Sequence, residues 1–238
     1  MHLEWLRVTK ACGYSHQEQY LLSPDTCLGI PNTRSRYYFL AKHRDSGQGI
    51  AHLLSATSES ALCSCIETCL PHLQDFTQGA LKRMTIGEII APLYQSPYFL
   101  SKSSSERAYE YHQQLLIPTD ILTSSWANSM ISIATPNDSL TYCFTKGYGK
   151  RYDHSTGSCY LPPLYGVDSV IDRDNLLQYK DRLRRFHPDE LLLLFGFPLE
   201  YRWPSLDEEV TLSACYGCIG NSISVHVVRE VMCRLFSM

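Results

Sequence analysis

The chain has 238 residues and a formal net charge of −3, with 44% hydrophobic and 19% charged residues. This balance excludes a disordered chain and predicts one or two globular domains. It also excludes a globally basic nucleic-acid-binding protein, so any nucleic-acid contact needs a local basic patch. We expect no membrane span and no export signal, and therefore reduced cysteines and a cytoplasmic location, with a nuclear pool left open.

The N-terminal part of the chain predicts a helix and two strands. Leu3–Cys12 has a fair amphipathic pattern that ends before Gly13. Glu18–Leu22 is a plausible strand, and the aromatic-rich segment Tyr37–Ala41 suits a buried strand. The polar segment His43–Ser60 predicts a loop.

The middle of the chain gives weaker signals. A short helix is expected over Met84–Leu93 and a longer one over Pro118–Ile133, where apolar residues fall roughly on one helical face. Tyr142–Thr145 predicts a strand, followed by a basic, glycine-containing loop over Lys146–Arg151.

Two helices are expected near the C-terminus. Pro188–Phe195 has proline first, acidic residues in its first turn and a glycine directly after it. Ser224–Leu235 is the last predicted helix. Its apolar stripe is expected to consist of Val225, Val228, Met232 and Leu235.

Arg34 and Arg36 stand at the start of the second predicted strand. Side chains two apart on a strand share a face, so two guanidiniums there could bind carbonyl oxygens, phosphates or carboxylates with fixed geometry. Two interpretations are open: a functional pair, or a surface pair that only bonds loop carbonyls.

The segment Cys143-Phe144-Thr145-Lys146-Gly147-Tyr148-Gly149 combines glycines with basic and aromatic side chains. Lys146, Lys150 and Arg151 could contact phosphates, and Tyr148 could stack on an unpaired base. The alternative is a β-hairpin whose lysines are simply solvated.

Gly220-Asn221-Ser222 directly precedes the last predicted helix. Backbone N–H groups at a helix start favour an anion such as a ligand carboxylate. An ordinary helix cap, worth about 1 kcal/mol, is the alternative.

The cysteines Cys63, Cys65 and Cys69, together with Cys215 and Cys218, could in principle close a zinc site. The first spacing is unusual, however, and the histidines have no metal-ligand spacing. We therefore predict no metal and treat these residues as free or buried thiols.

Three blocks in this order resemble the cytosine-C5 methyltransferases. They are Asn32-Thr33-Arg34-Ser35-Arg36, Phe195-Gly196-Phe197-Pro198 after Phe186-His187-Pro188, and Gly220-Asn221-Ser222. The Cys-Phe-Thr block followed by Lys-Gly-Tyr-Gly resembles the RNA-acting tRNA(Asp) cytosine-5 methyltransferases. Asn32, where many members have Gln, is typical of the same branch.

The resemblance implies an α/β fold: the C-terminal part of a Rossmann-like domain that uses S-adenosylmethionine (SAM), plus a mixed target-recognition region. Arg36 would reach O2 of the target cytosine and Arg34 would order the site. Gly220, Asn221 and Ser222 would line the cofactor pocket. The residues from Cys143 to Arg151 would contact tRNA, with tRNA(Asp) favoured. The oligomeric state is not predicted.

The resemblance runs from Leu3 to Phe236 and matches the C-terminal portion of a full enzyme, with the least similarity over His43–Ser105. The expected division is 1–42 as the last strands of the catalytic domain, 43–180 as target recognition, and 181–238 as closing helices. The sequence contains no Pro-Cys nucleophile and no Glu-Asn-Val block.

We therefore expect this chain to transfer no methyl group on its own, because the reaction needs a thiolate and an acid. The alternatives are a non-catalytic RNA-binding or regulatory module, a DNA cytosine-5 methyltransferase fragment, or a truncated product that is not stable by itself.

Overall fold

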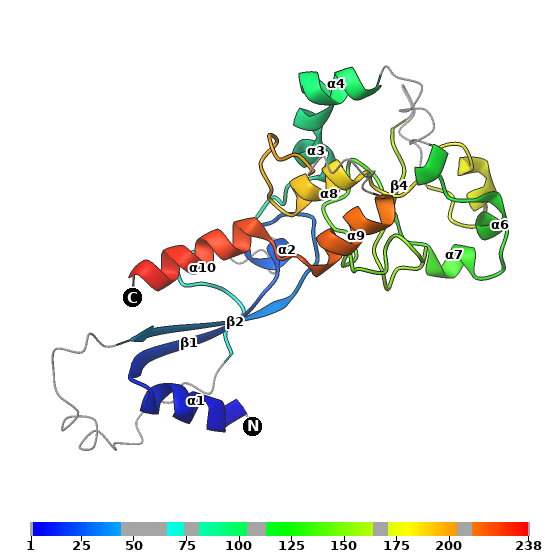
Figure 1. Cartoon of the computed structure of the whole chain (residues 1–238). Coiled ribbons are helices and arrows are strands. Elements are labelled where there is room, and N and C mark those ends of the chain that lie inside the picture. The colour runs from blue at the N-terminus through cyan, green and yellow to red at the C-terminus, as the bar shows by residue number, and fades with distance from the viewer. Residues whose placement is uncertain are drawn as a thin grey trace.

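The computed structural model describes residues 2–43, 66–73, 81–103, 113–163, 171–203 and 211–237. Figure 1 shows an elongated arrangement in which a helix and a β-hairpin form one end. The helices α6 and α7 lie at the other end, and the C-terminal helix α10 lies near the hairpin. The predicted loop at 43–60 and the cysteines Cys63 and Cys65 lie outside the described residues, apart from His43.

The N-terminal unit is built on two antiparallel strands. Helix α1 (His2–Ala11) precedes β1 (Tyr14–Leu22), and β1 pairs with β2 (Arg36–His43) in a register that sets Leu22 opposite Arg36. The short helix α2 (Pro24–Cys27) lies between the strands. The predicted helix and both strands are confirmed, but the expected burial of the second strand is not: β2 buries only Leu40, and its other side chains are partly or fully exposed.

Helix α10 (Val225–Ser237) covers one face of this hairpin. It buries Val227 and Val231 against Tyr20, Leu22 and Leu40. The predicted apolar stripe is therefore wrong in part. Val225 and Met232 are exposed, and Val228 and Leu235 are only partly buried. An amphipathic pattern fixes a face only to within neighbouring positions when apolar residues are dense.

A second core surrounds α8 (Pro188–Leu194), which packs on α3 (Ile86–Gln95) and α9 (Leu212–Asn221). Helix α8 begins with a capping box in which the His187 ring accepts from the Asp189 N–H and Glu190 accepts from the His187 N–H. This predicted helix is confirmed. The expected helix at Met84–Leu93 is shifted to α3 because Thr85 is its N-cap; α4 (Pro97–Ser103) follows.

Two predictions for the middle of the chain are wrong, the first of them in the third core. The expected long helix at 118–133 is instead α6 (Thr119–Leu122), α7 (Ala127–Met130) and the start of strand β3 (Ile133–Ala134). Strand β3 runs parallel to β4 (Cys159–Tyr160), and the 3-10 helix η3 (Leu176–Tyr179) closes this core. The segment 142–145 is not a strand either, because its groups are held mainly by side chains and turns.

Candidate functional site

Arg34 is the centre of the candidate site because it joins three distant segments. Its Nη1 donates to the backbone oxygen of Phe144 at 2.8 Å, and its Nη2 donates to that of Gly220 at 2.9 Å and to that of Ser222. Its guanidinium carbon lies 5.1 Å from the ring centre of Phe195. We call this set of contacts the Arg34 clamp. It ties the loop before β2 to the Cys-Phe-Thr segment, the end of α8 and the end of α9.

The start of α2 and its N-cap residue Ser23 hold the backbone around Arg34. The Arg34 N–H donates to Ser23 Oγ at 2.8 Å, and Thr33 Oγ1 donates to Asp25 Oδ2 at 3.2 Å. Proline at the first position of α2 presets its helical backbone, and Gly29 with φ of 65° turns the chain back toward the strand. The loop that carries Arg34 and leads into β2 at Arg36 is therefore held before any ligand binds.

Two polar atoms in this loop are buried without a hydrogen-bond partner among the described residues: Oδ1 of Asn32 and Nε of Arg34. Asn32 is fully buried, and its Nδ2 donates to the Leu194 oxygen at 3.2 Å. Burial, and next the positive charge of Arg36, lower the pKa of the Arg34 guanidinium, while Cys143 opposes that shift. The hydrogen-bond acceptors of the clamp are neutral backbone carbonyls. The Cys143 thiol also lies close to the guanidinium, with Sγ 3.7 Å from Nη1.

Arg36 behaves differently from Arg34. It is partly exposed, and its Nη1 donates to the neighbouring Ser35 oxygen at 2.7 Å. One of the two interpretations was a surface pair that bonds loop carbonyls. Arg34 does bond backbone carbonyls, but it is buried and does not lie on the surface. Arg36 keeps a partly exposed guanidinium beside the clamp.

The Cys-Phe-Thr segment is held by an aromatic cluster. The Phe144 ring is buried and makes edge contacts with Tyr148 at 5.1 Å and with Phe186 at 5.4 Å between ring centres. Gly157, with φ of 142°, leaves room for these rings, since a Cβ there would lie 2.6 Å from Phe144. Cys143 is partly exposed. Phe144 is therefore a core residue.

Tyr148 corrects one prediction. Its ring is 2% exposed, its hydroxyl donates to the Ser158 oxygen at 2.8 Å, and the same hydroxyl accepts from the Phe186 N–H at 2.9 Å. Burial raises the pKa of this phenol well above its ordinary value. A ring packed this way has no face left for a nucleobase, so the expected stacking role of Tyr148 is wrong.

The basic loop itself is confirmed as a turn, and its cationic side chains Lys146, Lys150 and Arg151 are exposed. Arg151 forms an ion pair with Asp153 at 2.8 Å, so its positive charge is largely neutralised. The loop is anchored by Arg185, whose Nε donates to the Tyr148 oxygen at 3.0 Å. The two lysines therefore form the cationic edge of the site.

Gly220, Asn221 and Ser222 end helix α9 and do not begin α10. The predicted anion site at a helix start is wrong in this respect, because their carbonyl oxygens, not their N–H groups, face the site: two of these oxygens accept from Arg34. A Cβ on Gly220 would lie 2.1 Å from the backbone nitrogen of Lys146. This position therefore requires glycine, because α9 packs directly against the backbone of the basic loop.

The side chains of these three residues differ in how far they could line a site for SAM. Ser222 Oγ donates to the Ile219 oxygen of its own helix at 2.7 Å, Gly220 is packed on backbone, and Asn221 is the member whose side chain is exposed. The side chains of Gly220 and Ser222 therefore offer no polar group that points away from the protein to a cofactor. At most Asn221 could contact a cofactor held by other groups.

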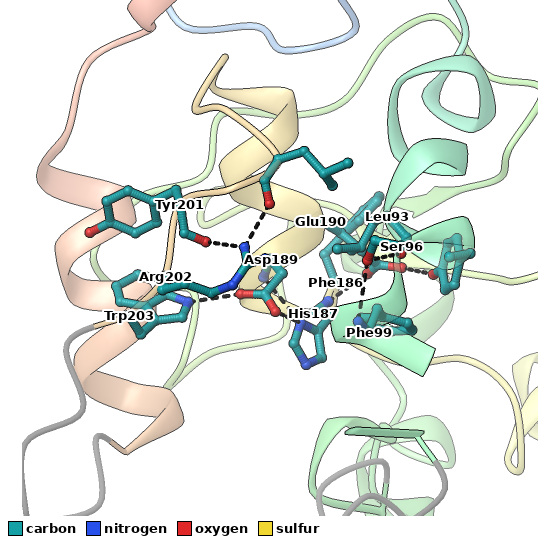
Figure 2. A network of polar contacts seen from close by, with 12 residues as sticks. Leu93, Ser96, Phe99, Phe186, His187, Asp189, Glu190, Tyr201, Arg202 and Trp203 are labelled. Atoms are coloured by element: carbon teal, nitrogen blue, oxygen red, sulfur yellow. Dashed lines mark hydrogen bonds and ion pairs between the residues drawn. The ribbon is translucent and has the colours of Figure 1, made fainter. Parts of the chain in front are cut away.

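A buried ionic cluster beside the site was missed at the sequence level. Arg184 and Glu190 pair through two hydrogen bonds of 2.7 and 2.8 Å, and the Tyr94 hydroxyl donates to the same carboxylate. Figure 2 shows Glu190 close to His187 and Asp189 at the start of α8. Acidic residues in a first helical turn signalled only capping, and nothing in the sequence indicated that Glu190 also neutralises a buried arginine.

Metal binding gains no support among the described residues, where no group of three metal-ligating side chains is found. Of the cysteines considered for zinc, Cys69 is partly exposed, Cys215 is buried and Cys218 is exposed. No described helix has the length and apolar character needed to cross a membrane.

With this geometry in view, comparison with known proteins defines the class: residues 2–237 match the C-5 cytosine-specific DNA methylase family. The chain belongs to this family and has its α/β methyltransferase fold. A Bos taurus protein named tRNA (cytosine(38)-C(5))-methyltransferase is 28% identical over 95% of this chain and 65% of its own length. A Dictyostelium discoideum DNA (cytosine-5)-methyltransferase is 30% identical over 60% of this chain and 35% of its own.

A crystal structure of a mutant form of Spodoptera frugiperda DNMT2 superposes with a TM-score of 0.67 and 24% identity, covering 98% of this chain and 61% of that one. The chain therefore spans somewhat less than two thirds of the length of the Bos taurus protein and of the Spodoptera frugiperda DNMT2 chain.

Proposed function

We propose that this chain is the substrate-binding part of a tRNA cytosine-5 methyltransferase. The observation that carries the proposal is the Arg34 clamp, which joins the Arg-x-Arg loop, the Cys-Phe-Thr segment and the end of α9 into one surface. Similarity to relatives named tRNA (cytosine(38)-C(5))-methyltransferase supports RNA as the substrate class. The resemblance of the Cys-Phe-Thr block favours tRNA(Asp).

The roles proposed for individual residues follow from their exposure. Arg36 is partly exposed beside the clamp, so its guanidinium is available to donate to O2 of a cytosine that has left the base stack. Lys146 and Lys150 would contact tRNA phosphates. Phe144 and Tyr148 act through the core, because they shape the segment that carries the lysines.

SAM supplies the methyl group in this reaction when it is bound, and Asn221 is the exposed member of the Gly220–Ser222 segment that could contact it. The sequence also contains no Pro-Cys pair and no Glu-Asn-Val block. We propose that the chain by itself binds tRNA in the cytoplasm, with a nuclear pool left open, and transfers no methyl group. A non-catalytic RNA-binding module is the second candidate, favoured by the exposed lysines of the basic loop.

The proposal is tested by the affinity of the 238-residue chain for an unmodified tRNA(Asp) transcript at increasing salt. We expect binding that weakens steeply with salt, and a smaller salt slope when Lys146 and Lys150 are replaced by alanine. Lys10→Ala with Lys42→Ala removes the same charge from α1 and β2 and should leave the slope unchanged. Equal losses in both double variants, or tighter binding to duplex DNA, would contradict tRNA recognition by this loop.

A further inference from the structure

Arg202 lies outside the clamp and has an unusual setting. Its Nη1 donates to the backbone oxygens of Leu199 at 2.7 Å and Tyr201 at 2.9 Å, and its guanidinium carbon lies 3.7 Å from the centre of the Tyr98 ring. The side chain is nevertheless exposed. One face of the guanidinium is therefore covered by an aromatic ring, although Arg202 as a whole stays exposed.

The loop that carries Arg202 is fixed along its length. Trp203 Nε1 donates to Asp189 Oδ1 at 2.9 Å, and the Phe197 N–H donates to the Leu192 oxygen at 2.9 Å. Figure 2 shows Arg202 between the two carbonyl oxygens, with Trp203 reaching α8 beside it. A guanidinium held in one position loses little conformational entropy when a ligand binds to it.

The hollow beneath Arg202 is too small to hold a ligand. It is lined by Leu93, Tyr98, Leu192, Pro198 and Arg202 among others, and has room of only about 10 Å³, roughly one water molecule. Asp189 and the exposed Glu200 place negative charge nearby, which disfavours a phosphate. A flat, uncharged group that rests on the guanidinium from outside fits this setting best.

The position of Arg202 connects it to the proposed RNA surface. The basic loop and the Arg202 loop are tied to opposite ends of one short segment: Tyr148 accepts from Arg185, and Trp203 donates to Asp189. From Asp189 to Phe195, under the Arg34 clamp, α8 rises about 9 Å. Unpaired RNA bases commonly stack on guanidinium planes.

We propose that Arg202, supported by Tyr98, forms a shelf on which an unpaired nucleobase of the RNA substrate stacks. The shelf rests on the proposed function and adds to it a second RNA contact, which reads the flat face of a base and not its phosphate. The residues that form it are Tyr98 on α4 and Arg202 in the loop after α8.

The test compares Arg202→Lys, Arg202→Met and the control Arg229→Lys on α10 for binding to tRNA and to a short single-stranded RNA with one fluorescent base analogue. Both Arg202 variants should weaken binding roughly tenfold and lose the stacking-dependent fluorescence change, because lysine keeps the charge but not the plane. Arg229→Lys should bind as the unmodified chain does. Full affinity of Arg202→Lys would overturn the shelf.

A second measurement covers the case in which the Arg202 variants unfold. Thiouridine-containing RNA is photocrosslinked to the unmodified chain, and the crosslinked peptides are identified by mass spectrometry. A crosslink within residues 197–203 or at Tyr98 supports the shelf, and its absence there overturns it. If tRNA binding depends on Lys146 and Lys150 but not on Arg202, the shelf is wrong and the proposed function stands. If no tRNA binds, the proposed function fails, and binding of the short RNA still tests the shelf.

Discussion

Arg34 donates a 2.8 Å hydrogen bond to the backbone oxygen of Phe144 across 110 residues of sequence. With the bonds to Gly220 and Ser222, it makes one buried side chain the common support of three segments. Arg36, two residues later, supports none of them.

The two arginines should therefore differ in their effect on stability. Arg34→Met leaves the oxygens of Phe144, Gly220 and Ser222 without this donor and should lower the free energy of unfolding by about 2–4 kcal/mol. Arg36→Met should change it by less than about 0.5 kcal/mol, since its contact is local and exposed. Urea unfolding of both variants measures this difference, and equal values would mean that Arg34 is not a structural clamp.

Glycines in α9 provide a matched pair. Gly220→Ala places a methyl group 2.1 Å from the Lys146 nitrogen and 2.2 Å from the Thr145 carbonyl carbon, so the helix or the basic loop must move. We expect a loss of about 2 kcal/mol or more. Gly217→Ala meets nothing within 4 Å and should stabilise the helix by about 0.5–1 kcal/mol. Thermal unfolding separates the two, and the same sign for both would contradict the packing described.

The Arg184–Glu190 pair predicts acid sensitivity. Burial raises the pKa of the Glu190 carboxyl, but the Arg184 charge and the hydrogen bonds outweigh it, so the net pKa is lowered. Its contribution to stability is therefore present above the unfolded pKa of about 4.3 and is lost as pH falls through the lower folded pKa.

Glu190→Gln should cost about 3–5 kcal/mol at neutral pH, because Arg184 stays buried without its counter-charge. It should also flatten the loss of stability on acidification. The double variant Arg184→Met with Glu190→Leu should recover most of the cost. Unfolding free energies measured from neutral to acid pH decide this; an unchanged acid slope in Glu190→Gln would show that another group is responsible.

Tyr148→Phe tests the core role assigned to this residue. The Phe186 N–H and the Ser158 oxygen would both lose their partner, which should cost about 1–3 kcal/mol. Affinity for tRNA, measured well below the unfolding temperature, should not change. A stable variant with much weaker RNA binding would restore the stacking role.

The parts of the fold that the sequence predicted are those with local signals. Helix α8 carries its own cap and proline, and the hairpin strands are bounded by turn residues. The segment 142–145 was predicted as a strand because Tyr, Cys, Phe and Thr favour strands, but its carbonyl partner is Arg34, more than a hundred residues away. Such a contact leaves no local pattern.

The site shows the same division. Glycine at position 220 could be read as a ligand-facing residue or as a packing residue, and only the distance to Lys146 decides for packing. Tyr148 resembled a stacking residue because exposure cannot be read from a Gly-Tyr-Gly segment. The Arg-x-Arg pair was located correctly, while the separation of a buried clamp from a partly exposed Arg36 needed the contacts of α9.

The most direct test of the account is methyl transfer from radiolabelled SAM to unmodified tRNA(Asp) by the purified 238-residue chain, with the Bos taurus relative as the positive control. The account predicts that the chain binds the tRNA and incorporates no label above background, since its sequence holds no Pro-Cys nucleophile. Sustained incorporation by the chain alone would contradict the account and require a different nucleophile within these residues.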